Sequence, residues 1–404
     1  MNGPLDKLFQ NISESFPDTP FEVEFWDGSI TVYGQGLKKF TLKIRKKNIV
    51  GRILNQGSLG FGEEFMLGNI EVEGDLQALL KLGNSEAYRS QHFSAIEKAK
   101  LIREFFLSRG TVANAKKNVS RHYDISNDFY KLWLDKTLTY SCAYFQNESD
   151  ALETAQLAKY EHLCKKLRLK PGESLVDIGC GWGQMMIYAA KNYGVGCVGC
   201  TLSNEQYEYA TEAVAKEGLR GKIKILLKDY REITGQFDKF VSIGMFEHVG
   251  KAFYPDFFSA VKRLLKPGGI GVLHHIGTIE DQPTDPWVVK YIFPGGWLPT
   301  LPVVLNEMNR NDLVYYDIED LRTHYAKTLD HWIANFENRI NNVEILMLDK
   351  LGGQDKVREF VLMWRLYLNG SSAAFKYGEN RLYQILFSNG LKNDLPLTRK
   401  YIYR

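Results

Sequence analysis

The chain has 404 residues, of which 44% are hydrophobic and 25% are charged, and its formal net charge is +3. This composition excludes a disordered protein, and the length leaves room for a full-sized catalytic domain with a smaller companion. The small net charge gives no reason to expect a nucleic-acid partner. The opening MNGPLDKLFQ lacks the layout of a secretory signal, and no apolar run is long enough to cross a bilayer.

The cysteines indicate a reducing compartment. Five cysteines, an odd number in a long chain, do not form a disulfide framework. Cys197 and Cys200 form a CxxC, but they stand in the small, apolar run GVGCVGCTLS, which is typical of two buried thiols beside a sheet. We therefore expect a cytoplasmic protein without a metal site.

Residues 1–85 are expected to form a small α+β domain. FEVEFWDGSITVYG and FTLKIRKK alternate apolar and polar residues as half-buried strands do, and Asp27-Gly28 predicts a hairpin between two of them. DLQALLKLG predicts a short helix that ends at Gly83. Nothing in this region indicates chemistry, so we interpret it as an accessory domain or an interface.

Residues 86–118 are polar and are interpreted as a helical connector, and residues 119–404 as the catalytic domain. A helix is predicted from about Leu152, capped by Asp150 and Glu153, with Leu157 on its apolar side. From SLVDIGCGWG onward, strand and helix patterns alternate, which predicts an α/β fold with a doubly wound, mostly parallel sheet. A Pro-, Trp- and Gly-rich stretch that begins at Asp281 interrupts this alternation, and we interpret about 281–345 as a lid insertion.

The strongest local signal is the glycine-rich loop VDIGCGWG, which stands between a predicted strand and a predicted helix. Glycines there let the backbone approach a ligand closely. Two details favour S-adenosylmethionine over a nicotinamide dinucleotide. The loop has the form D-x-G-x-G-x-G and begins with Asp177, and the next strand ends in TLS rather than in a ribose-binding acid. Later, Asp229 and Tyr230 offer a carboxylate for the adenine amine and a ring to stack on the base.

Several motifs resemble one family. The segment NVSRHYDISNDFYKLWLDKTLTYSCAYF, at 118–145, resembles the opening of cyclopropane fatty acid synthases, which include the mycolic acid cyclopropane synthases. The resemblance continues to about residue 390 through VDIGCGWG, GCTLSNEQ, SIGMFEHVG, LHHIG, YIFPGGWLPTL and YLNGSSAAFKYGENRLYQILFSNG. GSLGFGEEFMLGNIEVEGDL also resembles the accessory domain of members that act on phospholipids, which implies lipid binding or dimerisation for residues 1–85.

The resemblance implies a class I S-adenosylmethionine methyltransferase fold. It implies transfer of a methylene group from S-adenosylmethionine to a cis double bond of an unsaturated phospholipid acyl chain, which forms a cyclopropane ring. The partners it implies are a second copy of the chain and, through peripheral association, the inner leaflet of the membrane. Bicarbonate is implied as a second small ligand.

The family's site residues can be carried over position by position. The resemblance implies that the cofactor contacts Tyr140, Ser141, Gly179, Cys180, Gly181, Thr201, Leu202, Ser203, Asn204, Glu205, Gln206, Asp229 and Tyr230. It implies that bicarbonate and the catalytic step involve Cys142, Glu247, His274, Ile276 and Tyr325.

The reaction explains why such residues are needed. An isolated alkene has no proton to remove before attack, so the enzyme must hold the sulfonium methyl against it and exclude water. Methyl transfer leaves a carbocation, which aromatic faces stabilise without quenching. Candidate rings for the substrate pocket are Tyr123, Phe246, Tyr291, Phe293 and Phe375. Bicarbonate would then take the proton whose loss closes the ring, and it would supply partners for polar groups that are costly to bury alone.

One position departs from the family. Many relatives have a cysteine in the YLN segment, where this chain has Ser371. Either that cysteine is dispensable, as a bicarbonate base implies, or the protein is not a working synthase; we favour the first. Alternatives that stay open are another lipid C-methyltransferase with a methyl-branched or methylene product, a small-molecule N-methyltransferase, and a non-catalytic lipid carrier. An oxidoreductase is disfavoured by the loop.

Overall fold

The computed structural model describes residues 4–83 and 125–403. The connector predicted at 86–118 lies outside the described residues, and so does Tyr123. Residue contacts divide the chain into two compact units. The first unit comprises Met1–Leu107, Asp285–Ile292 and Trp332–Gly378, and the second comprises Ser108–Thr284, Phe293–His331 and Glu379–Arg404.

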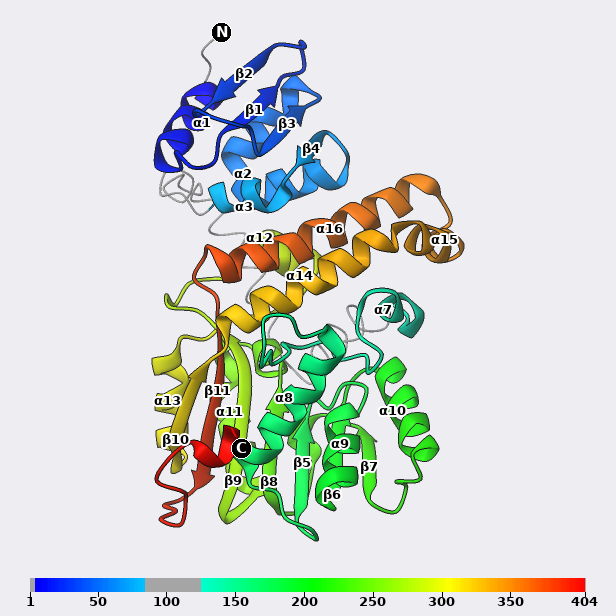
Figure 1. Cartoon of the computed structure of the whole chain (residues 1–404), viewed down its shortest axis with the longest axis vertical. Helices are drawn as coiled ribbons and strands as arrows, with labels where there is room; N and C mark the ends of the chain where they lie inside the picture. Colours follow the sequence, from blue (N-terminus) through cyan, green and yellow to red (C-terminus); the bar gives the residue numbers. More distant parts are fainter. Residues whose placement is uncertain (1–3, 84–124, 404) are drawn as a thin grey trace. The chain divides into compact units, whose positions relative to one another are not determined.

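The first unit contains a four-stranded sheet in the order β2-β1-β3-β4 (Figure 1). Its strands are β1 (Phe21–Glu24), β2 (Ile30–Tyr33), β3 (Phe40–Ile44) and β4 (Ile70–Gly74), preceded by helix α1 (Pro4–Ser15). β1 and β2 pair antiparallel, which confirms the predicted hairpin, and Gly28 in its turn has a φ of 81°. Helix α3 (Leu76–Leu82), capped by the side chain of Asp75, confirms the predicted short helix.

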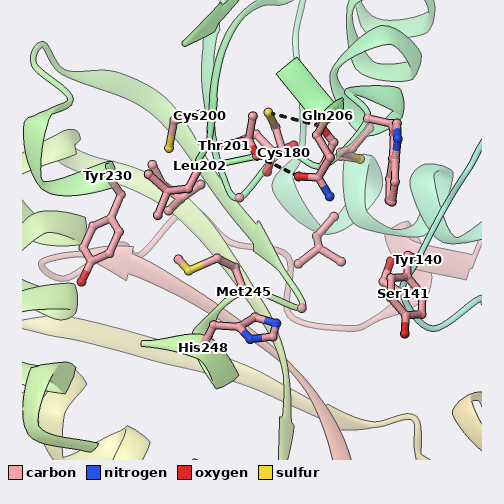
Figure 2. A pocket seen from close by; sticks show the side chains of 18 of the residues that line it. Tyr140, Ser141, Cys180, Cys200, Thr201, Leu202, Gln206, Tyr230, Met245 and His248 are labelled. Carbon is pink, nitrogen blue, oxygen red and sulfur yellow. Dashed lines mark hydrogen bonds between the residues drawn. The ribbon is translucent and has the colours of Figure 1, made fainter. Parts of the chain in front are cut away.

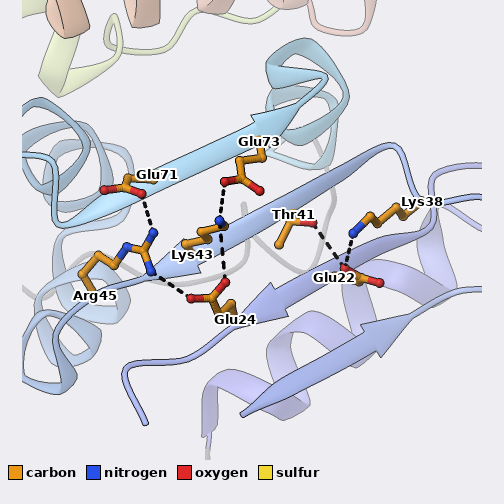
Figure 3. A network of polar contacts seen from close by, with 8 residues as sticks. All are labelled: Glu22, Glu24, Lys38, Thr41, Lys43, Arg45, Glu71 and Glu73. Carbon is orange, nitrogen blue, oxygen red and sulfur yellow. Dashed lines mark hydrogen bonds and ion pairs between the residues drawn. The ribbon is translucent and has the colours of Figure 1, made fainter. Parts of the chain in front are cut away.

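This sheet has one apolar and one charged face. The apolar face buries Phe21, Val23, Phe40 and Leu42. Figure 3 shows the opposite face, where ion pairs and a hydrogen bond join Glu22, Glu24, Lys38, Thr41, Lys43, Arg45, Glu71 and Glu73. Exposed pairs of this kind contribute about 0–1 kcal/mol each, so the apolar face supplies most of the stability.

Helix α2 (Val50–Met66), which follows the short helix η1 (Lys47–Ile49), packs against helix α12 (Pro286–Tyr291) within the first unit. A Cβ atom on Gly62 would lie 2.3 Å from Cδ1 of the buried Trp287. The buried carboxylate of Glu63 pairs with Lys290 Nζ at 2.5 Å and accepts a hydrogen bond from the Tyr291 hydroxyl at 3.0 Å. Glycine at position 62 therefore permits the indole to lie against the helix.

The first unit also contains all or part of three helices from later in the chain: α14 (Arg322–Asn338), α15 (Ile340–Leu351) and α16 (Gln354–Lys376). α14 begins in the second unit and ends in the first. Arg365 on α16 forms a two-pronged ion pair with Glu337 at the end of α14. Ser371, the position that departs from the family that the motifs resemble, is half-buried near the end of α16.

The second unit is built on a seven-stranded sheet in the order β10-β11-β9-β8-β5-β6-β7 (Figure 1). The strands are β5 (Ser174–Ile178), β6 (Gly196–Thr201), β7 (Ile223–Leu227), β8 (Phe237–Ile243), β9 (Leu265–Gly277), β10 (Leu313–Asp320) and β11 (Arg381–Asn389). β7, β6, β5, β8 and β9 are parallel. β11 runs antiparallel to β9, and the edge strand β10, which is antiparallel to β11, runs in the direction of the other five. The predicted doubly wound, mostly parallel sheet is confirmed.

Hydrophobic cores cover both faces of this sheet. One core joins the sheet to α8 (Leu152–Leu167), α9 (Gln184–Tyr193) and α10 (Asn204–Lys216). The other joins it to α11 (Tyr254–Leu264) and α13 (Leu301–Arg310). The short elements α7 (Asn127–Trp133), η2 (Tyr230–Glu232), η3 (Phe246–His248), η4 (Lys251–Phe253) and α17 (Lys400–Tyr403) complete the unit. The strand order reverses between β5 and β8, where open α/β sheets bind ligands.

Two local predictions for α8 are wrong. Its N-cap is Ala151, without a side-chain hydrogen bond, because the Asp150 carboxylate accepts hydrogen bonds from the backbone of Gln146 and Asn147 instead. Leu157, assigned to the apolar side, is 47% exposed.

The range interpreted as a lid insertion, 281–345, contains regular core structure. β10 extends the main sheet through its pairing with β11, and α13 packs Val304 and Met308 into the core. The part of this range that forms β10 and α13 therefore belongs to the sheet and its core rather than to a lid.

Candidate active site

A cavity opens at the carboxyl ends of β5, β6 and β8 in the second unit (Figure 2). Space not filled by atoms amounts to about 1170 Å³, part of which is open to solvent. The loops after β5, β6 and β7 line it, together with the segment around Tyr140 and with Met245 and His248 before and at the end of η3. This is the edge at which the fold positions a ligand.

The glycine-rich loop after β5 has the conformation that its sequence predicts. Gly179 has a φ of 82° and Gly181 a φ of 53°, both in the left-handed region. A Cβ on Gly179 would also lie 2.5 Å from Cγ of Met245. The N–H groups of Gly179 and Cys180 both donate to the carbonyl of Cys200 on β6, which fixes the loop on the sheet.

Most of the residues predicted to contact the cofactor line this cavity: Tyr140, Ser141, Gly179, Cys180, Gly181, Thr201, Leu202, Gln206, Asp229 and Tyr230. Three others do not. Ser203 is buried and caps α10 by accepting a hydrogen bond from the backbone of Gln206. Asn204 and Glu205 form the first turn of that helix. They position the loop rather than line the cavity.

Asp229 and Tyr230, predicted for the adenine end, follow β7 as expected. The buried Asp229 carboxylate accepts hydrogen bonds from Arg231, from Nε at 2.7 Å and from a terminal guanidinium nitrogen at 2.9 Å. The Tyr230 ring packs edge-on against Phe257. The Asp229 carboxylate that lines the cavity is therefore already paired with the Arg231 guanidinium. The sequence pattern did not indicate this ion pair.

The segment that carries Tyr140, Ser141 and Cys142 is held by two helices. From α8, Gln156 donates to the carbonyl of Ser141 at 3.0 Å, and the Lys159 ammonium donates to the Ser141 hydroxyl at 2.8 Å. From α14, the Thr328 hydroxyl accepts a hydrogen bond from the Ala143 N–H and His324 Nδ1 accepts one from the Phe145 N–H, each at 3.0 Å. This extended segment is therefore fixed without being part of a sheet.

Glu247 and Ile276, predicted for the carbonate site, are brought together. Oε1 of the buried Glu247 accepts a hydrogen bond from the Ile276 N–H at 2.5 Å. Its other oxygen, Oε2, is buried without a hydrogen-bond partner among the described residues. Burial raises the pKa of Glu247 to about 7.

His274 lies two residues before Ile276 on β9. Its Nδ1 is 3.1 Å from the side-chain nitrogen of Gln384 on β11, and its Nε2 is buried without a partner in the described part of the chain. Burial holds the pKa of His274 well below its usual range. Cys142 is buried and burial raises its pKa, so it is a neutral thiol. Tyr325 lies half-buried in the first turn of α14.

The aromatic candidates for the substrate pocket are dispersed. Phe246 is fully buried in the core beside Tyr254 and Phe257, at ring-centroid distances of 4.5 and 4.8 Å. Phe293 contacts the ring of His248 edge-on at 5.0 Å. The other two described candidates, Tyr291 and Phe375, belong to the first unit, the former bonded to Glu63 and the latter buried on α16.

Three of the other side chains that line the cavity were not predicted from the sequence: Lys159, Met245 and His248. Figure 2 shows Met245 and His248 beside the cofactor residues. Burial lowers the pKa of His248 to about 4, so its imidazole is neutral and does not repel a cationic donor. Met245 and His248 flank the predicted Glu247 in MFEH, a signal that was available. For Lys159 the sequence contained no such signal, because a lysine in a helix is ordinarily exposed to solvent.

The sequence pattern described as mycolic acid cyclopropane synthetase matches residues 111–385. The chain belongs to this family. A second pattern, described as a domain of unknown function (DUF7884), matches residues 6–97. The resemblance inferred from the motifs is thereby confirmed, and the protein is an S-adenosylmethionine-dependent methyltransferase.

Curated relatives extend over both units. A probable fatty acid methyltransferase of Pseudomonas putida is 36% identical over 95% of this chain and 96% of its own length. The cyclopropane-fatty-acyl-phospholipid synthase of Escherichia coli K12 is 37% identical over 89% of this chain and 90% of its own length.

Solved structures confirm the class I methyltransferase fold. The cyclopropane synthase MmaA2 of Mycobacterium tuberculosis covers 67% of this chain and 97% of its own, with 32% identity and a TM-score of 0.63. The mycolic acid cyclopropane synthase CmaA1, bound to S-adenosylhomocysteine (SAH) and CTAB, has the same coverage, 35% identity and a TM-score of 0.60. Among the described residues, no helix has the length and apolarity needed to span a membrane.

Proposed function

We propose that this protein transfers a methylene group from S-adenosylmethionine to a cis double bond in the acyl chain of an unsaturated phospholipid, closing a cyclopropane ring, and that it holds bicarbonate as the base. The name and coverage of the Escherichia coli relative support a phospholipid substrate. The CTAB in one related structure supports an extended apolar chain as the occupant of the pocket.

One observation carries the bicarbonate part of the proposal. Glu247 Oε2 and His274 Nε2 are both buried without a hydrogen-bond partner among the described residues, although buried polar atoms are nearly always paired. Both belong to residues predicted for the carbonate site. A small oxyanion has the donor and acceptor oxygens that each of the two atoms lacks, so the chemistry of these residues fits the group.

The protonation states favour an anion at this position. Since the pKa of Glu247 is about 7, a large fraction of this carboxyl carries a proton near neutral pH and can donate to an oxyanion. The amide of Gln384 donates to Nδ1 of His274, which favours the tautomer with the proton on Nε2. Each of the two side chains could therefore act as a donor to a bound anion.

The residues around the cavity suit a reaction through a carbocation. The segment at Tyr140 and the glycine-rich loop line the cavity that would hold the donor. A bound acyl chain would then have to close its open side to water that would quench the cation. His248 stays neutral, and the buried cysteines are neutral thiols rather than competing nucleophiles. Bicarbonate, when bound, accepts the proton that must leave before the ring closes.

The proposal includes action at the inner leaflet of the membrane as a peripheral homodimer. Its support is chemical: the double bonds of a phospholipid are within a bilayer, so an enzyme that modifies them must approach the surface. The family resemblance supports the dimer.

Lipid mass spectrometry tests this function. We expect incubation with S-adenosylmethionine and unsaturated phospholipid to add one methylene unit to the acyl chain, with loss of the alkene signal in NMR. A second candidate, methylation to a branched or methylene-bearing chain, is favoured by the name of the Pseudomonas putida relative. It predicts the same or a similar mass gain without cyclopropyl protons. Methylation of an added amine, with unchanged lipid, would refute both.

A further inference from the structure

A buried lysine lies beside the cofactor cavity. Lys159 stands in the middle of α8, only 1% of its surface is exposed, and it lines the cavity. Its ammonium donates a hydrogen bond to the Ser141 hydroxyl at 2.8 Å and lies 4.7 Å from the ring centroid of Tyr160. An ammonium has three donor hydrogens, so a neutral hydroxyl and a ring leave it under-satisfied.

Other buried lysines of this unit show what a satisfied ammonium looks like. Lys166, two turns later on α8, is fully buried and pairs with Glu319 at 2.5 Å. Lys239 is buried and lies 3.5 Å from the carboxylate of Glu173. For Lys159, no carboxylate among the described residues is within ion-pair distance. Because buried charges are costly without a partner, an anion from outside the described chain would complete the site.

The cavity also contains a matching acid. Asp177 is 2% exposed, lines the same cavity, and its Oδ1 has no hydrogen-bond partner among the described residues. Burial raises the pKa of Asp177 to about 7, and the Lys159 ammonium opposes that rise. Lys159 and Asp177 thus provide one basic and one acidic side chain to the cavity. S-adenosylmethionine has an amino-acid end with one carboxylate and one ammonium, which would match them.

Ser141 supplies a second donor at this place. Because Lys159 donates to the oxygen of Ser141, the hydroxyl proton of Ser141 remains available to another acceptor. Ser141 and Lys159 are therefore hydrogen-bonded neighbours in the lining of the cavity, and each has a donor hydrogen left for a ligand. Asp229 and Tyr230 line the cavity from the loop after β7, the end assigned to the adenine.

We propose that Lys159, together with the Ser141 hydroxyl, binds the carboxylate of the methionine end of S-adenosylmethionine, an assignment that depends on this molecule being the donor. The ion pair fixes the amino-acid end and so orients the sulfonium methyl. Burial lowers the pKa of free Lys159 to about 7, and a bound carboxylate raises it again, which strengthens the charged form in the complex.

Calorimetry with two ligands tests the assignment in the full-length protein. Decarboxylated S-adenosylmethionine lacks only the carboxylate, so the wild type should bind it on the order of 10- to 100-fold more weakly than S-adenosylmethionine. Lys159→Met should weaken binding of S-adenosylmethionine by a similar factor and leave the affinity for the decarboxylated ligand unchanged. Lys159→Arg, which keeps the charge, should restore part of the preference.

Lys166→Met is the matched control, because it removes a buried lysine from the same helix away from the cavity lining. It should lower thermal stability but preserve the preference for the carboxylate. Equal weakening of both ligands in Lys159→Met would show a structural role and overturn the proposal. If that variant does not fold, equal affinities of the wild type for the two ligands would overturn it. Tight binding without any lipid product would refute the proposed function and leave this assignment intact.

Discussion

The carboxyl of Glu247 on η3 accepts a hydrogen bond from the backbone N–H of Ile276 on β9, with 2.5 Å between Oε1 and N. A glutamine at position 247 keeps an oxygen for this bond but cannot exchange a proton with an anion at the second position. Glu247→Gln should therefore bind S-adenosylmethionine normally, while turnover falls by about 10²-fold or more. Calorimetry and cyclopropane formation measure the two effects. Undiminished turnover would show that the carbonate site is misassigned.

Removal of bicarbonate gives an independent test of the same site. Buffers purged of carbon dioxide should slow cyclopropane formation by the wild type, and added bicarbonate should restore the rate in a saturable manner. The rate of the Glu247→Gln variant should rise only weakly when bicarbonate is added, since one of the two side chains proposed to bind the anion is changed. A wild-type rate that is the same with and without bicarbonate would exclude the anion as the base.

The unfolding of the protein should report the ionisation of Glu247. Burial raises the pKa of this carboxyl from 4.5 to about 7, so between these values the folded protein keeps a proton that the unfolded chain has released. Stability from this group therefore falls as the pH rises from 4.5 to 7 and changes little above 7. Glu247→Gln lacks this loss, so its Tm relative to the wild type should rise between pH 5 and pH 8. The two Tm values should be compared in bicarbonate-free buffer. A Tm difference between variant and wild type that does not change with pH would contradict the raised pKa of Glu247.

The thiols should be dispensable for catalysis. All five cysteines are buried, and burial raises the pKa of each thiol, which keeps them in the unreactive form. Iodoacetamide should leave cyclopropane formation unchanged. Ser371→Cys, which introduces the cysteine of many relatives at a half-buried position, should not increase turnover. A marked gain in that variant would indicate that the cysteine has a catalytic role in the family.

Packing in the first unit can be tested by matched glycine substitutions in α2. Gly62→Ala would place a Cβ 2.3 Å from the indole of Trp287, so we expect destabilisation by about 1–3 kcal/mol. Gly51→Ala, in the part of α2 before its kink at Gly57 and with no atom within 4 Å of the new Cβ, should leave stability unchanged or raise it. Denaturant unfolding of the two variants provides the comparison. Equal stabilities would mean that α12 does not pack on α2 as described.

The sequence predicted those parts of the protein that depend on local patterns. The glycine-rich loop was found because Gly179 and Gly181 need left-handed backbone that other residues avoid. The antiparallel edge was missed, since β10 and β11 are separated by three helices in the chain and only their pairing shows that they share a sheet. The burial of Lys159 was missed for the opposite reason: its surroundings come from segments remote in sequence, which no helical periodicity reveals.

The pairing of β9 with β11 sets an order of events during synthesis. His274 on β9 receives its Gln384 contact from a strand more than a hundred residues downstream, and β11 must also insert between β9 and β10. A ribosome that has released the loops around β5 and β6 has thus made the part of the sheet that carries the glycine-rich loop well before the pair of strands that holds His274 and Gln384 can assemble. Nascent chains arrested before residue 381 should therefore be able to recognise the methyl donor but not to use it.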